Sequence, residues 1–327
     1  MPSEDPRKYP LYDTTFTLHR VSPLYTGNPL DNNSLQQHAR SFRDRLVGDV
    51  LRGVRVGLAT DNDSLAASGA LQTVTWRLLP EENLWNTSDE TELDATISSS
   101  IARGWLISVT YENAKYKAIL LRGAQQEGQE AEGDDGFEHI PLLLMRMPGS
   151  LREAFIQFLT ETFDTRVSVM RLQTPYLTSA LEEYISSCSM RVLQNVISEV
   201  EIDLGFDNPT GNGMLYRIRI VTAREDLPRM VLSGKKIERT ENREESPFIT
   251  ALRTHVDAHF ALNMKHEMLK IMKIACAAFV LGEEGKAKIT EPTVHDLDFN
   301  QSQATWRLID SLVELAEGGE LSKGIGD

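Results

Sequence analysis

Cysteine, long apolar runs and the motifs of known catalytic centres are scarce or missing in this sequence. Only Cys188 and Cys276 occur in 327 residues, which is too few for a disulfide framework and favours a reducing compartment, the cytosol or the nucleus. The first ten residues, MPSEDPRKYP, are polar and rich in proline, so we expect no signal peptide. No apolar run approaches the roughly 20 residues that span a bilayer.

Enzymatic motifs are also missing. There is no Walker loop and no GxSxG elbow, and the glycines at Gly211 and Gly213 lack the third glycine of a dinucleotide-binding loop. Cys188 and Cys276 lie in apolar stretches without a neighbouring histidine or a CxxC partner, which is typical of buried structural thiols. We therefore expect a protein that is not an enzyme and that has no catalytic residue, cofactor or metal ion.

One pair of histidines leaves an enzymatic alternative open. His255 and His259 are four residues apart in HVDAH, and His266 follows. Two histidines at this spacing share one face of a helix and can bind zinc together, so a metal-dependent hydrolase that uses them with a carboxylate is an alternative. The glutamate of the metalloprotease motif is missing, however, and no cysteine cluster supports a site, so ordinary histidines on a polar helix face explain the pattern better.

Acidic residues exceed basic ones and are concentrated in two segments. The net charge is −14, with 48 acidic and 34 basic residues. Residues 81–94 and 124–138 each contain six acidic residues and no Lys or Arg, so the remainder of the chain is nearly neutral. We interpret both segments as surface insertions. The overall charge argues against a general nucleic-acid-binding protein, because phosphate contacts need Lys and Arg.

A local basic cluster is the exception to this acidic character. It comprises Arg40, Arg43, Arg45, Arg52 and Arg55, and Asp44 and Asp49 partly offset it. Arg40, Arg43 and Arg52 are the candidates to face DNA through phosphate contacts. A solvated helix face is the simpler interpretation. A stand-alone DNA-binding module remains a further alternative.

Hydrophobic periodicity predicts an α+β protein with a mostly antiparallel sheet, helices packed on it, and two sheet-containing halves. We expect a flexible tail at residues 1–11, an N-terminal half at 12–190, a C-terminal half at 191–317 and a second tail at 318–327. Alternation predicts strands that include residues 12–20, 54–58, 74–78, 105–111, 116–122, 140–145, 166–172, 196–206 and 214–222. Residues 32–34 offer an N-cap for a first helix, and Ser150 with Glu153 forms a capping box for a second. Further helices are expected to begin at Thr174 and at Ser246, and a last one contains Trp306.

The most informative segment for binding is LKIMKIACAAFVLG, residues 269–282. We interpret it as a long strand of a hairpin that forms an open sheet edge, because a partner strand is one way to cover an apolar edge. An ordinary central strand is an equally good interpretation. If the segment is an edge, one of Ile271 and Ile274 should face the partner, because residues at odd spacing point to opposite faces. We then expect Ile271→Asp or Ile274→Asp to break a complex while the fold is kept.

Three stretches resemble the centromere protein L family of inner-kinetochore subunits. They are FTLHRVSPLY at residues 16–25, IPLLLMRMPGSLREAFIQFLTETFDTRVSVMRL at 140–172, and the C-terminal region from Ser246 through a strand near 259–265 and a hairpin to the Trp306 helix. The resemblance covers about residues 12–317. Its motifs are packing patterns rather than catalytic signatures, so their order and spacing carry it.

The resemblance implies a nuclear scaffold of the constitutive centromere-associated network with a curved antiparallel sheet. It implies pairing with a centromere protein N family subunit through the C-terminal sheet edge, contact with other subunits of the network, and contact with the centromeric nucleosome within the assembly. A homodimer is possible in isolation. The implied partner-binding residues are Met268, Lys270, Ile271, Met272, Ile274, Cys276, Ala278 and Val280. Because the net charge is −14, any basic surface toward DNA would be supplied jointly with the partner.

Overall fold

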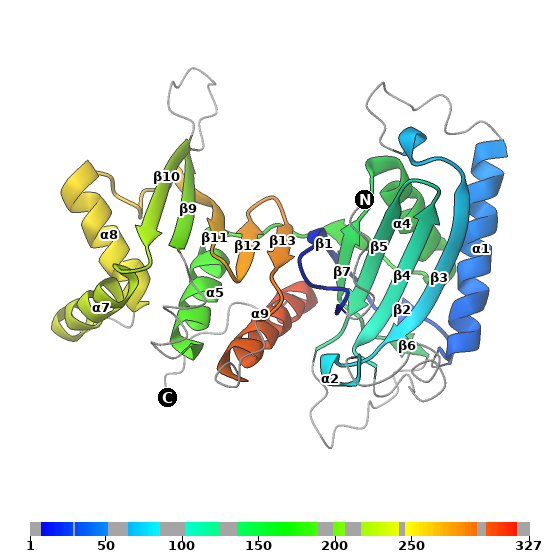
Figure 1. Cartoon of the computed structure of the whole chain (residues 1–327), viewed down its shortest axis with the longest axis horizontal. Helices are drawn as coiled ribbons and strands as arrows, with labels where there is room; N and C mark the ends of the chain where they lie inside the picture. The colour runs from blue at the N-terminus through cyan, green and yellow to red at the C-terminus, as the bar shows by residue number, and fades with distance from the viewer. Residues whose placement is uncertain are drawn as a thin grey trace. The chain divides into compact units, whose positions relative to one another are not determined.

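A computed structural model describes residues 8–28, 30–51, 65–85, 102–123, 136–188, 199–206, 217–241, 246–292 and 299–318 (Figure 1). The chain divides into two compact units. The first contains residues 16–170 together with residues 1–11 and 312–324, and the second contains residues 171–311 with residues 12–15 and 325–327. The helix α5 (Thr174–Ser187) thus belongs to the second unit, whereas the sequence suggested a first half that ends near residue 190.

The first unit is built on an antiparallel sheet with the strand order β1-β7-β5-β4-β3, and β8 pairs with β1. These strands are β1 (Thr15–Val21), β7 (Leu142–Arg146), β5 (Lys115–Leu121), β4 (Gly104–Tyr111), β3 (Leu71–Leu79) and β8 (Val167–Val169). A separate two-stranded sheet joins β2 (Leu24–Tyr25) to β6 (Phe137–Glu138). Short helical turns lie at η1 (Ala66–Ser68) and α2 (Glu82–Trp85).

Two helices cover one face of this sheet and bury an aromatic core. They are α1 (Asn32–Leu51) and α4 (Gly149–Phe163). Trp76 of β3 is fully buried, and its ring lies 6.0 Å from that of Phe155 and 6.3 Å from that of Trp105. Phe42 of α1 joins the same cluster, with its ring 5.3 Å from Phe155. Aromatic contacts of this kind supply a large apolar area in fixed relative geometry.

Helix α1 also covers the outer edge of β3. The side-chain amide of Gln36 donates a hydrogen bond to the Trp76 carbonyl oxygen at 3.1 Å, and the Leu78 N–H donates to Asn32 Oδ1 at 3.4 Å. These contacts satisfy main-chain groups that an unpaired strand would leave open. Helix α1 therefore covers the β3 edge at Trp76 and Leu78.

The helix starts differ in detail from those that the sequence predicts. Asp31, rather than a residue of 32–34, caps α1, because its Oδ1 accepts hydrogen bonds from the Ser34 N–H at 2.8 Å and from the Ser34 hydroxyl at 2.6 Å. These bonds lower the pKa of Asp31. The predicted capping box at Ser150 and Glu153 is wrong: Pro148 stands at the N-cap of α4 and makes no side-chain capping bond.

The second unit contains an antiparallel sheet with the order β10-β9-β11-β12-β13. Its strands are β10 (Arg217–Ala223), β9 (Glu199–Phe206), β11 (Leu269–Ala275), β12 (Phe279–Gly282) and β13 (Lys286–Ile289). Its helices are α5, α7 (Leu227–Glu241), α8 (Pro247–Phe260) and most of α9 (Phe299–Glu317). The core side of the sheet carries Val200, Ile202, Leu204, Ile271, Ile274, Phe279, Leu281 and Ile289, which are all buried.

The start of the chain completes this second sheet. Tyr12 forms a parallel bridge with Ile289 of β13, and the Asp13 N–H donates to the Ile289 carbonyl oxygen at 2.7 Å. Tyr9 and Leu11, which the sequence placed in a flexible tail, are buried in the first unit. The Tyr9 hydroxyl donates to the Pro80 carbonyl oxygen at 2.7 Å. The residues before the first strand are therefore part of the packed structure from Tyr9 onward.

The prediction of an α+β fold is confirmed, because helices pack on mostly antiparallel strand pairs in both units. The strand predicted at residues 54–58 lies outside the described residues, as do most of the two acidic segments. The strand expected near residues 259–265 is not formed: α8 continues to Phe260 and a turn follows. Over the described helices, none is both long and apolar enough to cross a bilayer.

Candidate protein-interaction surface

The hairpin expected to form an open edge lies inside the sheet of the second unit. β11 pairs with β9 on one side and with β12 on the other, so that Ile274 is opposite Ile202 in one ladder and opposite Leu281 in the other. Its main-chain groups are used within the protein, and β11 has no free edge for another polypeptide. The prediction of an edge at residues 268–280 is therefore wrong. The partner β9 lies far earlier in the sequence, so no local signal indicated this pairing.

The residues proposed for partner binding have different environments. Ile271, Ile274 and Ala278 are buried, Met268 and Lys270 are exposed, and Met272, Cys276 and Val280 are half-buried. A β-bulge between Ile271 and Lys273 inserts Met272 into the ladder. The extra residue reverses the alternation, so Ile271 and Ile274 both face the core despite their odd spacing. Neither is available to face a partner.

The open edge of the second unit is β10. Among the described residues, β10 pairs only with β9, over seven positions from Arg217 opposite Gly205 to Ala223 opposite Glu199. In an antiparallel ladder, about half of the main-chain groups of an outer strand point away from its neighbour. Val221 is 52% exposed although it lies in the middle of the strand. The sequence predicted a strand here but not an open edge, although the alternation of Arg217 and Arg219 with Ile218 and Ile220 is the signal of a half-exposed strand.

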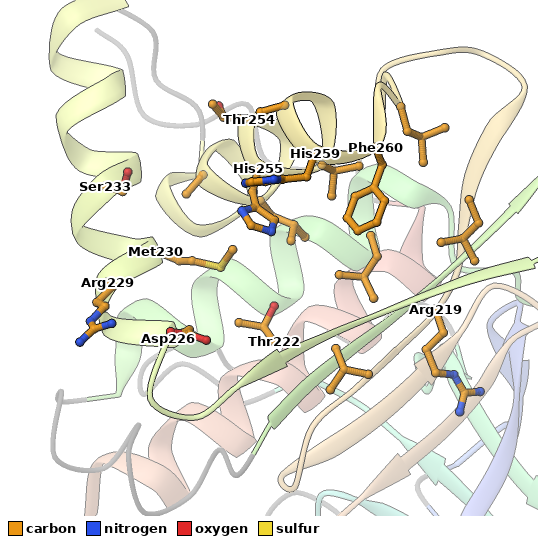
Figure 2. A pocket seen from close by; sticks show the side chains of 18 of the residues that line it. Arg219, Thr222, Asp226, Arg229, Met230, Ser233, Thr254, His255, His259 and Phe260 are labelled. Carbon is orange, nitrogen blue, oxygen red and sulfur yellow. The ribbon is translucent and has the colours of Figure 1, made fainter.

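A groove runs beside this strand, and we call it the β10 groove. It has a volume of about 970 Å³, and residues of β10, α7 and α8 line it (Figure 2). Its walls are mainly apolar and include Ile220, Met230 and Phe260. The Phe260 side chain, at the end of α8, is 69% exposed. An exposed aromatic beside an apolar groove and an open strand is the arrangement that protein interfaces use.

Ionic contacts fix β10 against β9. Arg219 Nε donates to Asp203 Oδ1 at 2.8 Å and lies 3.2 Å from Glu201 Oε1, while Arg217 Nη1 lies 3.7 Å from Asp203 Oδ2. Asp203 has no exposed surface. Its hydrogen bond and charge raise the pKa of Arg219. On the other side, Lys273 Nζ contacts Glu201 Oε1 at 3.0 Å, so the same carboxylate joins β9 to β11.

The two helices of the groove are held by close backbone contacts. A Cβ atom at Gly234 of α7 would lie 1.7 Å from the Pro247 carbonyl oxygen at the start of α8, so only glycine permits this approach. Glu182 of α5 is buried and accepts hydrogen bonds from the Phe248 N–H at 3.2 Å and the Ile249 N–H at 3.4 Å. A carboxylate at these otherwise unpaired N–H groups stabilises a helix start. These contacts position α8 and its exposed Phe260 beside β10.

The histidines of the hydrolase alternative do not form a described metal site. His255 and His259 lie side by side on α8, with ring centroids 4.3 Å apart and ring planes tilted by 47°, and both line the β10 groove (Figure 2). His266 lies in the turn after α8, where its Nδ1 accepts a hydrogen bond from the Met268 N–H at 3.2 Å. Within the described part of the chain, no group of three His, Cys, Asp or Glu side chains is placed to hold a metal ion.

Neither cysteine forms a disulfide, and Cys188 is buried. Burial raises the pKa of the Cys276 thiol to about 11, which disfavours the reactive thiolate.

The basic cluster is only partly described. Arg40 and Arg43 are exposed on α1, whereas Arg45 forms an ion pair with Glu161 of α4. Arg52 and Arg55 lie outside the described residues. Arg40 and Arg43 are thus accessible from solvent, and their role as DNA-facing residues stays a prediction.

A comparison with known protein families identifies the family of this chain. The family model of centromere protein L matches residues 10–317 of the 327. The chain belongs to the centromere protein L family. No curated protein matches the sequence. Membership of the centromere protein L family makes this a structural protein of the kinetochore and centromere in the nucleus, with a role in chromosome segregation and association with other kinetochore proteins.

Proposed function

We propose that this centromere protein L family member is a non-enzymatic scaffold subunit that pairs with a centromere protein N family subunit. In this role the pair links the centromeric nucleosome to the rest of the kinetochore. The single observation that carries the location of the pairing surface is the unpaired outer side of β10. The β10 edge replaces residues 268–280 as the proposed main-chain docking site.

The β10 edge fits strand addition because it offers both main-chain groups and side-chain pockets. A partner strand that continues the sheet would satisfy the outward N–H and C=O groups of β10. Alternate side chains of that strand would then contact Val221 and the other residues that line the β10 groove. At β3, the outer strand of the first unit, Gln36 and Asn32 already bond to the main chain at Trp76 and Leu78.

Charge around the groove indicates the composition of the partner segment. The lining includes the cations Arg219 and Arg229 and the single acidic residue Asp226, and Arg219 is already paired with Asp203 and Glu201. Acidic side chains flanking an apolar strand or helix would complement this rim, since opposite potentials across an interface favour the correct partner.

Contact with DNA is proposed only for the assembled complex. Arg40 and Arg43 are exposed cations on α1, and Arg52 follows them in the sequence. Such residues would add to a basic surface that the partner supplies, because few phosphate contacts by themselves give little affinity. Met268, Lys270 and Met272 keep exposed surface near β11 and remain secondary candidates for side-chain contacts with the partner.

The test is a binding titration of the purified full chain with the centromere protein N family subunit of the same species. We expect Val221→Asp and Phe260→Asp each to weaken binding at least tenfold, because a carboxylate would be buried in the interface. Both side chains are more than half exposed in the free chain, so the fold should be retained. Val169→Asp is the matched control, because Val169 is a 65% exposed valine on a strand of the first unit.

Unchanged affinity for both groove variants would contradict the β10 assignment. The molecular mass of the isolated chain in solution adds a second readout. If β10 also pairs with a second copy, the wild type is dimeric and Val221→Asp is monomeric. Loss of binding by Val169→Asp alone would move the interface to the first unit.

A further inference from the structure

The tripeptide Arg-Val-Ser occurs twice in the sequence, at residues 20–22 and 166–168. The first copy ends β1 and the second begins at the residue before β8. The strands pair antiparallel, with Arg20 opposite Ser168 and Val21 opposite Val167. The ladder continues through the Ser22 N–H, which donates to the Arg166 carbonyl oxygen at 3.0 Å. Each arginine therefore lies opposite the serine of the other copy.

Strand alternation gathers the four polar side chains on one face. Val21 and Val167 pack on the apolar core formed with α1 and α4, so their neighbours Arg20, Ser22, Arg166 and Ser168 point to the other side. These four residues line one hollow of about 520 Å³. Residues directly opposite in an antiparallel pair have Cβ atoms about 5 Å apart. Ser168 is thus next to Arg20 across the strand pair, and Arg166, two residues before Ser168, lines the same hollow.

The two serines are not equivalent. The Ser22 Oγ lies 3.0 Å from Thr165 Oγ1 and accepts a hydrogen bond from the Arg166 N–H at 2.9 Å, so it is held in the turn. Ser168 is exposed on β8, a strand of three residues whose only strand partner among the described residues is β1. Its neighbour Val169 is 65% exposed. Ser22 is exposed as well, but its hydroxyl is bonded in the turn, so Ser168 carries the hydroxyl of the pair that is left to react, and its backbone is already extended.

Two arginines and one acidic residue line this hollow, so its charge suits an anion. Arg20 has a buried Nε atom without a hydrogen-bond partner in the described structure. Arg166 is exposed at the rim. The other titratable residues that line the hollow are His139 and Glu317. A buried guanidinium N–H that lacks an acceptor is costly, so this site is one acceptor short.

We propose that Ser168 is a phosphorylation site and that Arg20 and Arg166 bind the phosphate. A serine kinase that selects arginine two residues before its acceptor would transfer the γ-phosphoryl group of ATP to Ser168 Oγ. The new O–P bond replaces the O–P bond to the leaving ADP, and the hydroxyl proton is released. The phosphate oxygens then accept charge-assisted hydrogen bonds from Arg20 across the strand pair and from Arg166 on the same strand.

The phosphate would link two short strand segments, β8 and the end of β1. A phosphoserine carries about −1.5 to −2 charges at neutral pH and three strong acceptor oxygens. It would supply the acceptor that Arg20 Nε lacks and would hold β8 against β1. It would also change this surface from basic to acidic. The site belongs to the first unit and is independent of the β10 edge.

The test uses the purified full chain, a serine kinase with this arginine preference, ATP and Mg²⁺. We expect mass spectrometry to find phosphate on Ser168 and not on Ser22, and phosphorylation to raise the Tm by about 2–6 °C. Arg20→Ala keeps the recognition sequence Arg166-Val167-Ser168, so it should be phosphorylated to the same extent but should lose most of the Tm increase. Ser168→Ala should take up no phosphate here, and Ser22→Ala should behave as wild type.

A synthetic peptide of residues 160–176 serves as the positive control for the kinase. Phosphorylation of this peptide without phosphorylation of the folded chain would overturn Ser168 as the acceptor, and so would phosphate on Ser22. An equal Tm increase in wild type and in Arg20→Ala would overturn the phosphate contact with Arg20. Each result is independent of whether the chain binds a centromere protein N family subunit.

Discussion

Arg219 Nε donates a 2.8 Å hydrogen bond to Oδ1 of Asp203, a side chain without exposed surface. This bond ties the open strand β10 to its only described neighbour, β9. The bond to β9 therefore fixes β10, the edge that we propose for docking, before a partner binds. This lowers the entropic cost of ordering β10 on binding.

Removing this arginine should destabilise the second unit. Arg219→Ala leaves a buried carboxylate short of donors, and a buried acceptor that loses its partner costs about 1–3 kcal/mol. Urea unfolding monitored by circular dichroism measures the loss. Arg217→Ala is the matched control, because Arg217 lies 3.7 Å from the same carboxylate and should matter less. Equal midpoints for Arg219→Ala and wild type would show that Asp203 does not depend on this contact.

Ile274 should be important for folding rather than for selective binding. Its side chain is fully buried between β9 and β12, so Ile274→Ala should lower the free energy of unfolding by about 2–5 kcal/mol. Ile274→Asp should fail to give a folded second unit. Met268→Ala, at a 41% exposed side chain next to β11, should change stability little. If the Ile274→Asp variant folded normally and lost only its binding to the partner, β11 would again be the candidate docking edge, against the strand pairing described here.

Two helical glycines should respond in opposite directions to the same substitution. Gly234→Ala places a Cβ 1.7 Å from the Pro247 carbonyl oxygen and must push α7 and α8 apart, so we expect a loss of at least about 1–3 kcal/mol. Gly48→Ala in α1 meets no atom within 4 Å and should gain about 0.5–1 kcal/mol from helix propensity. Thermal unfolding of the two variants measures both effects. Similar Tm values for them would contradict the close approach of α7 and α8.

The free energy of unfolding should fall in mild acid because His19 is buried in its neutral form. Burial lowers the pKa of His19 from 6.5 to about 4, so the unfolded chain binds a proton more readily than the folded chain between these values. The contribution of His19 is complete above pH 6.5 and is lost as the pH falls toward 4, to an extent of roughly 2–3 kcal/mol. Urea midpoints at pH 7.5 and pH 5 should differ more for wild type than for His19→Phe. An identical pH dependence in both would exclude His19 as the cause.

Local patterns predicted the elements whose hydrogen-bond partners lie nearby in the sequence. Alternation predicted strands at residues 105–111 and 116–122, and these are β4 and β5, which pair as a hairpin of neighbouring segments. The apolar and polar pattern of residues 149–163 likewise predicted α4, although its cap was wrong. These elements could be predicted because the residue pattern that indicates each of them lies within one continuous segment.

The pairing of β11 depends on contacts that a local pattern does not encode. Leu269–Ala275 has the composition of either an edge or a central strand, and β9 decides between them from about 70 residues away. The bulge at Met272 then reverses the side-chain alternation on which the Ile271 and Ile274 argument depended. Glu182 is a further example, because a glutamate inside α5 gives no sign that it will cap α8.

The early residues Tyr12–Thr15 belong to the second compact unit, while Leu312–Gly324 near the other terminus belong to the first. Cleavage between Met170 and Arg171 would consequently deprive each fragment of a piece of its own unit. Neither unit is encoded by one continuous stretch of the gene. Fragments intended to isolate one unit must therefore carry residues from both ends of the polypeptide or be made by permuting its order.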